Sequence, residues 1–148
     1  MISETANKKR KLKNEALLEL LLRSHYGILS TVSKTGYPSC LPVSFVYLDN
    51  AIYIHSSDER CELENISNNN CKVSFCIVGL NLVKPENFEF NSVTIYGVAS
   101  ELLENEKNIT IEKLANKYYS YNDDKGKLCI RNIFLKNKII KICVEYIQ

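Results

Sequence analysis

The sequence predicts a mainly β domain of the α+β class, built as a small antiparallel barrel with helices around it. Short runs rich in Val, Ile, Tyr, Phe and Thr recur at regular spacing and are separated by turn residues. Two other segments space their apolar residues as helices do. The chain has 148 residues, 45% apolar and 24% charged, which fits one globular domain with a real core.

The first elements follow directly from these patterns. Asn14 can cap a helix whose leucines form one broad apolar face, and Gly27 ends it. From Gly27 onward the pattern changes to short β runs joined by the turn sequences KTGYP and DN. These runs read ILSTVS, CLPVSFVYL and AIYIHS. We expect three antiparallel strands in succession.

A short helix should follow, because Ser56 and Glu59 have capping-box spacing and Leu63 and Ile66 lie one turn apart. The run CKVSFCIVG is the next strand, and SVTIYGVASEL is another after the polar, Phe-containing insertion LNLVKPENFEF. Gly97 indicates a bulge or bend in that strand.

The last third of the chain contains a helix and a strand. Residues 105–121 are mostly spaced as a helix, residues 122–126 are a loop, and NKIIKICVEYI is the closing strand. We therefore expect a six-stranded antiparallel barrel whose open ends are covered by helices. A barrel this small is filled by side chains, so a sizeable ligand must bind in a groove outside it or between two subunits.

Charge and cysteine content narrow the function classes. The net charge of the whole chain, +2, is too small to indicate nucleic-acid binding, and the chain is divided into a basic arm at 1–13 and one domain at 14–148. A basic N-terminal arm at 1–13 is either a solvated tail or a contact for phosphate or an acidic partner. Six cysteines without CxxC or zinc spacing indicate reduced thiols and no metal site. The apolar run LLELLL is interrupted by Glu19, so neither a secretory signal nor a membrane span is expected, and we expect a cytoplasmic protein.

Few residues fit a catalytic template. GxSxG, HExxH, GxxxxGK[ST] and GxGxxG are all absent from the sequence. His55 and Cys61 flank one strand-to-helix corner and could form a dyad, but no third residue is evident to orient it, and inert packing of the cysteine is the favoured interpretation. His55 directly precedes a helix start, where anions are commonly held; its alternative is an ordinary half-exposed strand end.

The order of several segments carries a family resemblance. The segment GILSTVSKTGYPSCLPVSFVYLDNAIYIHSS is followed by LENI, KVSF, SVTIYGVASEL and a helix ending in KYY. Over about residues 16–147 this order resembles the pyridoxamine 5'-phosphate oxidase-like proteins, the FMN-binding split-barrel family, and within it the branch of nitroimidazole-resistance reductases.

The resemblance implies FMN bound at a homodimer interface by a six-stranded split barrel. It places the second strand beside the isoalloxazine and ribityl chain, the end of the third strand against the cofactor, an arginine on the phosphate and a serine of a later strand near the flavin. Cys61 stands where a phosphate-binding lysine is expected. The implied cofactor-binding residues are Pro42, Val43, Ser44, Ile54, His55, Ser56, Arg60, Cys61 and Ser92.

The strand-to-helix corner expected to bind the FMN phosphate carries a net negative charge. The local formal charge is minus three, because one base, Arg60, stands against four acids: Asp58, Glu59, Glu62 and Glu64. Losing one charge-assisted hydrogen bond to phosphate costs about 1.5 to 3 kcal/mol, which weakens binding roughly ten- to a hundredfold. We therefore expect FMN binding that is weaker than in proteins with the lysine.

The function that follows is an FMN-dependent oxidoreductase of a small molecule, either nitroaromatic or pyridoxamine phosphate-like, because the flavin carries the redox chemistry without an acid or base from the protein. The alternative is a degenerate dimer that binds a flavin or another small ligand without catalysis. A third hypothesis is that the basic arm binds nucleic acid, but no base-reading helix or base-stacking motif accompanies the arm.

Overall fold

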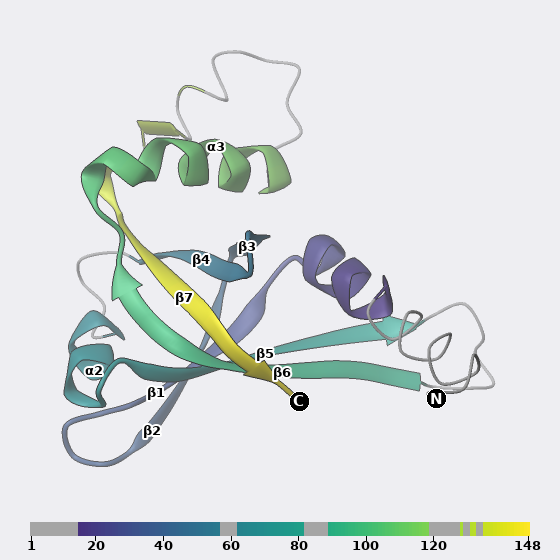
Figure 1. Cartoon of the computed structure of the whole chain (residues 1–148), viewed down its shortest axis with the longest axis horizontal. Helices are drawn as coiled ribbons and strands as arrows, with labels where there is room; N and C mark the ends of the chain where they lie inside the picture. Colours follow the sequence, from purple (N-terminus) through teal and green to yellow (C-terminus); the bar gives the residue numbers. More distant parts are fainter. Residues whose placement is uncertain (1–14, 57–61, 82–88, 119–127, 129–130, 133–134) are drawn as a thin grey trace, which may run out of the picture.

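The computed structural model describes residues 15–56, 62–81, 89–118, 128, 131–132 and 135–148. Its strands form one antiparallel sheet of seven, in the order β2-β1-β5-β6-β7-β4-β3 (Figure 1). The strands are β1 (Gly27–Val32), β2 (Pro38–Val43), β3 (Phe45–Leu48), β4 (Ala51–Ser56), β5 (Lys72–Asn81), β6 (Glu89–Glu101) and β7 (Lys138–Ile147).

The two end strands of this sheet are one continuous stretch of chain bent at Ser44. β2 ends at Val43, which pairs with Gly27 of β1, and β3 begins at Phe45, which pairs with Ile54 of β4. A segment that pairs with different neighbours along its two halves must bend between them, and this bend closes the sheet. The predicted six-stranded barrel is thus confirmed, with its second strand divided into two by the bend.

Large apolar side chains fill the barrel. The rings of Phe45 and Phe75 meet edge to face, with centroids 5.1 Å apart, and neither side chain is exposed. The isoleucines of β4, β6 and β7 pack around them. The interior is therefore occupied, as the sequence predicted.

Gly97 marks a bulge, also as predicted. The register between β6 and β7 shifts between Tyr96 and Gly97, where Tyr146 and Val144 are the facing partners. A Cβ at Gly97 would lie 2.3 Å from the carbonyl oxygen of Cys143, which is backbone and cannot move aside. Only glycine allows the two strands to approach this closely.

Within residues 15–118, as far as the structure describes them, three α-helices pack against the barrel. The helix at residues 15–23 buries Leu21 against the core and leaves Leu18 and Leu22 exposed. α2 (Glu62–Asn68) buries Ile66 and contacts β1. α3 (Lys107–Tyr118) follows the short 3-10 helix η1 (Glu104–Glu106) and lies over one end of the sheet (Figure 1).

α3 covers the outer side of β3, β4 and β7. Its Ile111 and Leu114 are fully buried and belong to a second apolar cluster with Val46, Tyr53 and Ile139. These strand residues alternate with the residues that fill the barrel, so the two clusters lie on opposite faces of the same strands. One part of the outer surface is thus buried by the chain itself.

Several predicted features lie outside the described residues: the basic arm at 1–13, the Glu59 end of the capping box, most of the Phe-containing insertion and the loop at 122–126. Within the described ranges, no helix has the length and apolar character needed to cross a membrane. The same ranges contain no cluster of three or more His, Cys, Asp or Glu side chains suited to a metal ion.

Candidate cofactor site

Most of the predicted site residues meet at the bend between β2 and β3. Phe45 pairs with Ile54 as the last pair of the β3–β4 ladder, so Ser44 and His55 lie just beyond it on neighbouring strands. Pro42 and Val43 precede Ser44 on β2. Segments predicted from two separate strands therefore converge at one edge of the barrel.

Alternation along the strands decides which of these side chains a ligand outside the barrel can meet. Val43, Ile54 and Ser56 point inward and are buried. Pro42 is exposed, while Ser44 and His55 are partly exposed. A ligand on the outer surface would meet the side chains of these last three residues, and only the backbone of Ile54.

Ser92 is not brought to this edge. It is exposed on β6, where it pairs with Val78 of β5. The strands β1 and β5 lie between β6 and Pro42 on β2, a separation of about 14 Å at the usual strand spacing. Ser92 can join the same site only from a second subunit or through an extended ligand.

The phosphate corner lies largely outside the described residues, which exclude Arg60 and Cys61. One part of its charge is described: Glu64 of α2 forms an ion pair with Lys34 from the β1–β2 turn. Adding this lysine to the local count changes minus three to minus two, since it offsets one of the four acids. Local sequence spacing does not indicate this ion pair, because Lys34 is 30 residues away from Glu64 along the chain.

Tyr118, which the sequence analysis did not assign to the site, fixes the end of α3 to the bend. Its hydroxyl accepts a hydrogen bond from the N–H of Phe45 at 2.7 Å and donates one to the carbonyl oxygen of Phe45 at 2.9 Å. Burial raises the pKa of Tyr118, and hydrogen bonds to Phe45 and Ser44 partly offset that effect. The helix end is thereby held against the segment expected to contact the cofactor.

Lys117 is the second residue that the sequence analysis missed. Its Nζ is buried, has no hydrogen-bond acceptor in the described part of the chain, and lies 3.7 Å from the centroid of the Phe45 ring. Burial lowers the pKa of Lys117 to about 8. A buried ammonium with only an aromatic face as its partner is costly, so this cation is available to a negative group.

The opposite outer face, formed by β2, β1, β5, β6 and the end of β7, is not covered by α3. Two rows of facing residues cross it, and neither contains a charged residue. The first row is Cys40, Ser30, Ser74, Tyr96 and Tyr146, and the second is Pro42, Ile28, Cys76, Thr94 and Gln148.

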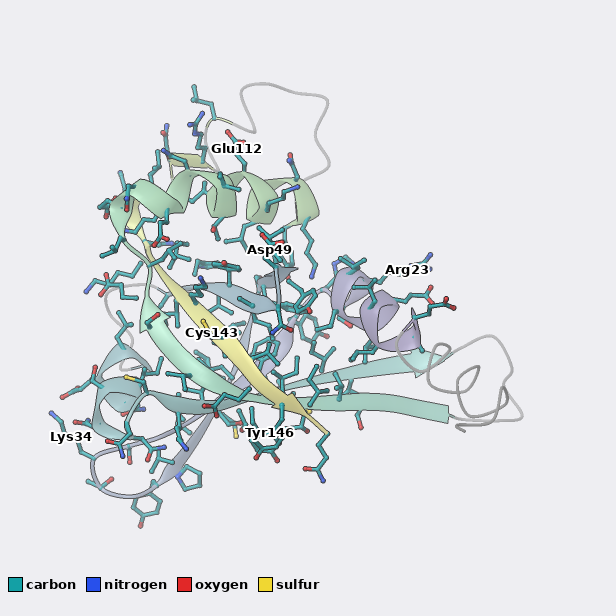
Figure 2. The ribbon with its side chains drawn as sticks, viewed as in Figure 1. Arg23, Lys34, Asp49, Glu112, Cys143 and Tyr146 are labelled. Atoms are coloured by element: carbon teal, nitrogen blue, oxygen red, sulfur yellow. The ribbon has the colours of Figure 1, made fainter. Side chains whose placement is uncertain are left out.

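The rings in the first row form an aromatic surface. Tyr96 and Tyr146 stack with centroids 4.5 Å apart and 12° between their planes. Figure 2 shows Tyr146 near the end of β7, away from α3. Tyr146 is 56% exposed and Val78 on the same side is 55% exposed. Uncharged, partly apolar exposed surface of this kind is typical of an interface.

Comparisons with known proteins agree with this architecture. The family model for pyridoxamine 5'-phosphate oxidase matches residues 14–132, and no curated protein matches the chain. The fold described above defines the class of the protein, a small antiparallel barrel with helices on its outside. The chain belongs to the pyridoxamine 5'-phosphate oxidase family.

Solved structures share the fold at low sequence identity. A protein from Bacteroides thetaiotaomicron named for 5-nitroimidazole antibiotic resistance has 20% identity and a TM-score of 0.70, covering 90% of this chain and 80% of that chain. An FAD-binding protein from Mesorhizobium loti has 16% identity and a TM-score of 0.64, covering 90% of each. The heme storage protein HutZ from Vibrio cholerae has 14% identity and a TM-score of 0.70, covering 90% of this chain and 92% of that chain.

The described residues fit the ring-side half of a flavin. Pro42 presents an apolar ring, and Ser44 and His55 present polar groups on neighbouring strand positions. The buried ammonium of Lys117 lies over the ring of Phe45, next to Ser44, with no acceptor among the described residues. A flavin is flat, largely apolar and carries polar edges, so this donor set suits it.

Proposed function

We propose that the protein is an FMN-dependent oxidoreductase that acts on a small molecule. The observation that carries the proposal is the convergence of Pro42, Ser44 and His55 on the outside of a filled barrel. A barrel without interior space must bind a cofactor on its surface, and this bend is where its polar and apolar groups are combined.

Bound FMN would supply the acceptor for a hydride or for electrons. The protein's own residues bind and orient it: Ser44 and His55 offer hydrogen bonds to the polar edge and side chain of the cofactor, and Pro42 packs on its apolar surface. Tyr118 holds the Ser44–Phe45 backbone in place. Arg60 is expected to hold the phosphate, beside Cys61.

We further propose a homodimer with FMN at its interface. The uncharged rows on the uncovered face support this, because a two-fold interface buries the same surface from both subunits without placing like charges together. The distance of Ser92 from the bend supports it too, since a second subunit can bring Ser92 to the cofactor of its partner.

The proposed substrates are nitroaromatic compounds or molecules resembling pyridoxamine phosphate. The likeness to a protein named for 5-nitroimidazole resistance supports the first class, and the family supports the second. A flavin exposed on the outside of the barrel would react with either class without a catalytic acid or base.

A visible spectrum and a solution mass of the purified protein test the proposal. We expect a yellow protein that releases FMN on denaturation, and a mass of twice 17.0 kDa by sedimentation. Colourless protein that does not quench the fluorescence of micromolar FMN would refute cofactor binding. A monomer that retains FMN would refute the interface site.

Turnover separates the enzyme from the alternative, a flavin-binding dimer without catalysis. Purified holoprotein should transfer electrons from a reduced nicotinamide to a nitroaromatic acceptor, or from a pyridoxamine phosphate-like amine to molecular oxygen. The alternative predicts bound FMN with no turnover of either class above that of free FMN.

A further inference from the structure

We propose that Lys117 provides the positive charge that favours the reduced, anionic form of the flavin over the oxidised form. This inference rests on the proposed function, because it assumes that FMN binds along Ser44. It assigns Lys117 an electrostatic effect on the flavin that requires no direct contact.

The position of Lys117 is fixed by the residue that follows it. Tyr118 is hydrogen-bonded to the N–H and to the carbonyl oxygen of Phe45, the residue that follows Ser44. The Lys117 ammonium lies 3.7 Å from the ring centroid of Phe45 and 5.5 Å from that of Tyr118. The cation is therefore held one residue from the expected cofactor segment.

The surroundings of this ammonium make it electrostatically effective. The ring of Phe45 is fully buried and packs against Phe75, so little water separates the charge from the bend. Charges act more strongly where water is excluded. With a pKa of about 8, Lys117 remains predominantly protonated at pH 7.

A role at the helix C-terminus alone does not explain why the Lys117 ammonium is buried. A lysine in the last turn of a helix is favourable near the helix C-terminus, and Lys117 occupies such a position. A lysine serving only that purpose would keep its ammonium in water, as long side chains on a surface usually do. Here Nζ is buried instead, without an acceptor in the described part of the chain.

The charge balance of flavin reduction gives this cation a function. A hydride from a reduced nicotinamide brings two electrons and one proton, the nicotinamide leaves as its cation, and the flavin ring gains one negative charge. A unit charge at a separation on the order of 10 Å, acting through an effective dielectric constant near 20, changes such an equilibrium roughly tenfold. Lys117 should therefore bind the reduced form more favourably by about that factor.

The test compares two lysine substitutions on α3. Lys117→Met removes the buried charge, and Lys113→Met removes an exposed charge one turn earlier. We expect Lys117→Met to lower the preference for reduced FMN about tenfold, which is about 30 mV in the two-electron midpoint potential. Lys113→Met should change this preference by less than twofold. Equal shifts in the two variants, or no shift in Lys117→Met, would overturn the inference.

A second measurement on the unsubstituted protein does not depend on how Lys117→Met folds. By linkage, the pKa of Lys117 should rise about one unit on flavin reduction, measured from the ¹³Cε resonance of labelled lysine. An unchanged pKa would also overturn the inference. If the unsubstituted protein binds no FMN, the proposed function fails and this inference fails with it; binding without either shift removes the inference alone.

Discussion

The two outer faces of the barrel differ in how they are completed. The face of β3, β4 and β7 is covered by α3, whose Ile111 and Leu114 are fully buried there. The face of β2, β1, β5 and β6 carries two uncharged rows and exposed Val78 and Tyr146. The first face is covered by this chain, while the second is partly exposed and uncharged along these two rows. We take this difference as the main structural argument for a second subunit.

The largest expected effect comes from truncating equivalent apolar groups on the two faces. Leu114→Ala should lower the free energy of unfolding by about 2 to 5 kcal/mol, because it leaves a cavity under α3. Val78→Ala should lower it by less than about 0.5 kcal/mol in the isolated monomer. Urea denaturation at protein concentrations below and above dimer formation measures both values. Equal losses in the monomer would show that the two faces do not differ.

The second prediction concerns the attachment of α3. Tyr118→Phe removes the hydroxyl that pairs with both backbone groups of buried Phe45, so the unfolding free energy should fall by about 1 to 3 kcal/mol. Hydrogen exchange should become faster at the amide of Phe45, while the β5–β6 amides stay protected. An unchanged exchange rate at Phe45 would show that this hydrogen bond does not hold the bend.

The third prediction tests whether the uncovered face tolerates an added charge. Ser74→Lys places a cation in the middle of the first row, and in a two-fold interface it would place two such cations near each other. We expect the fold to persist and the dimer to dissociate about tenfold more readily, measured by sedimentation. Asn108→Lys adds the same charge to the exposed side of α3 and should leave the association unchanged.

The last prediction is a dependence of stability on pH, and it concerns the covered face. The pKa of Lys117 is lowered from 10.5 to about 8 by burial, so the unfolded chain binds more protons between these values. The contribution of Lys117 to stability is therefore least favourable below pH 8 and improves as the pH rises toward 10.5. Relative to Lys117→Met, the unsubstituted protein should gain unfolding free energy across this window. A constant difference would mean that Lys117 is not desolvated.

Local patterns in the sequence were sufficient for most of the fold. Alternation and turn residues located the strands, and the isolated Gly97 indicated the bulge. The division of CLPVSFVYL at Ser44 was not predicted, because the run is apolar on both sides of the bend. The bend arises from pairing with two different neighbours, which is information from the barrel as a whole.

The candidate site was predicted only where its residues are close in sequence. Ser44 and His55 lie on adjacent strands of one hairpin, and their proximity follows from the register. Tyr118 reaches Phe45 across 73 residues, and Lys34 reaches Glu64 across 30. No periodicity in either segment specifies such contacts, since they depend on how α3 and α2 dock. The assignments of Arg60, Cys61 and Ser92 stay predictions.

The position of β7 in the sheet has a consequence for folding during synthesis. β7 is the last strand along the chain, yet it lies between β6 and β4. Until a ribosome has passed residues 138–147, β4 and β6 each present an unpaired edge, and the barrel cannot close. The nascent chain must keep these edges apart from other chains, which favours an early pairing of β5 with β6 and a late, cooperative insertion of the final strand.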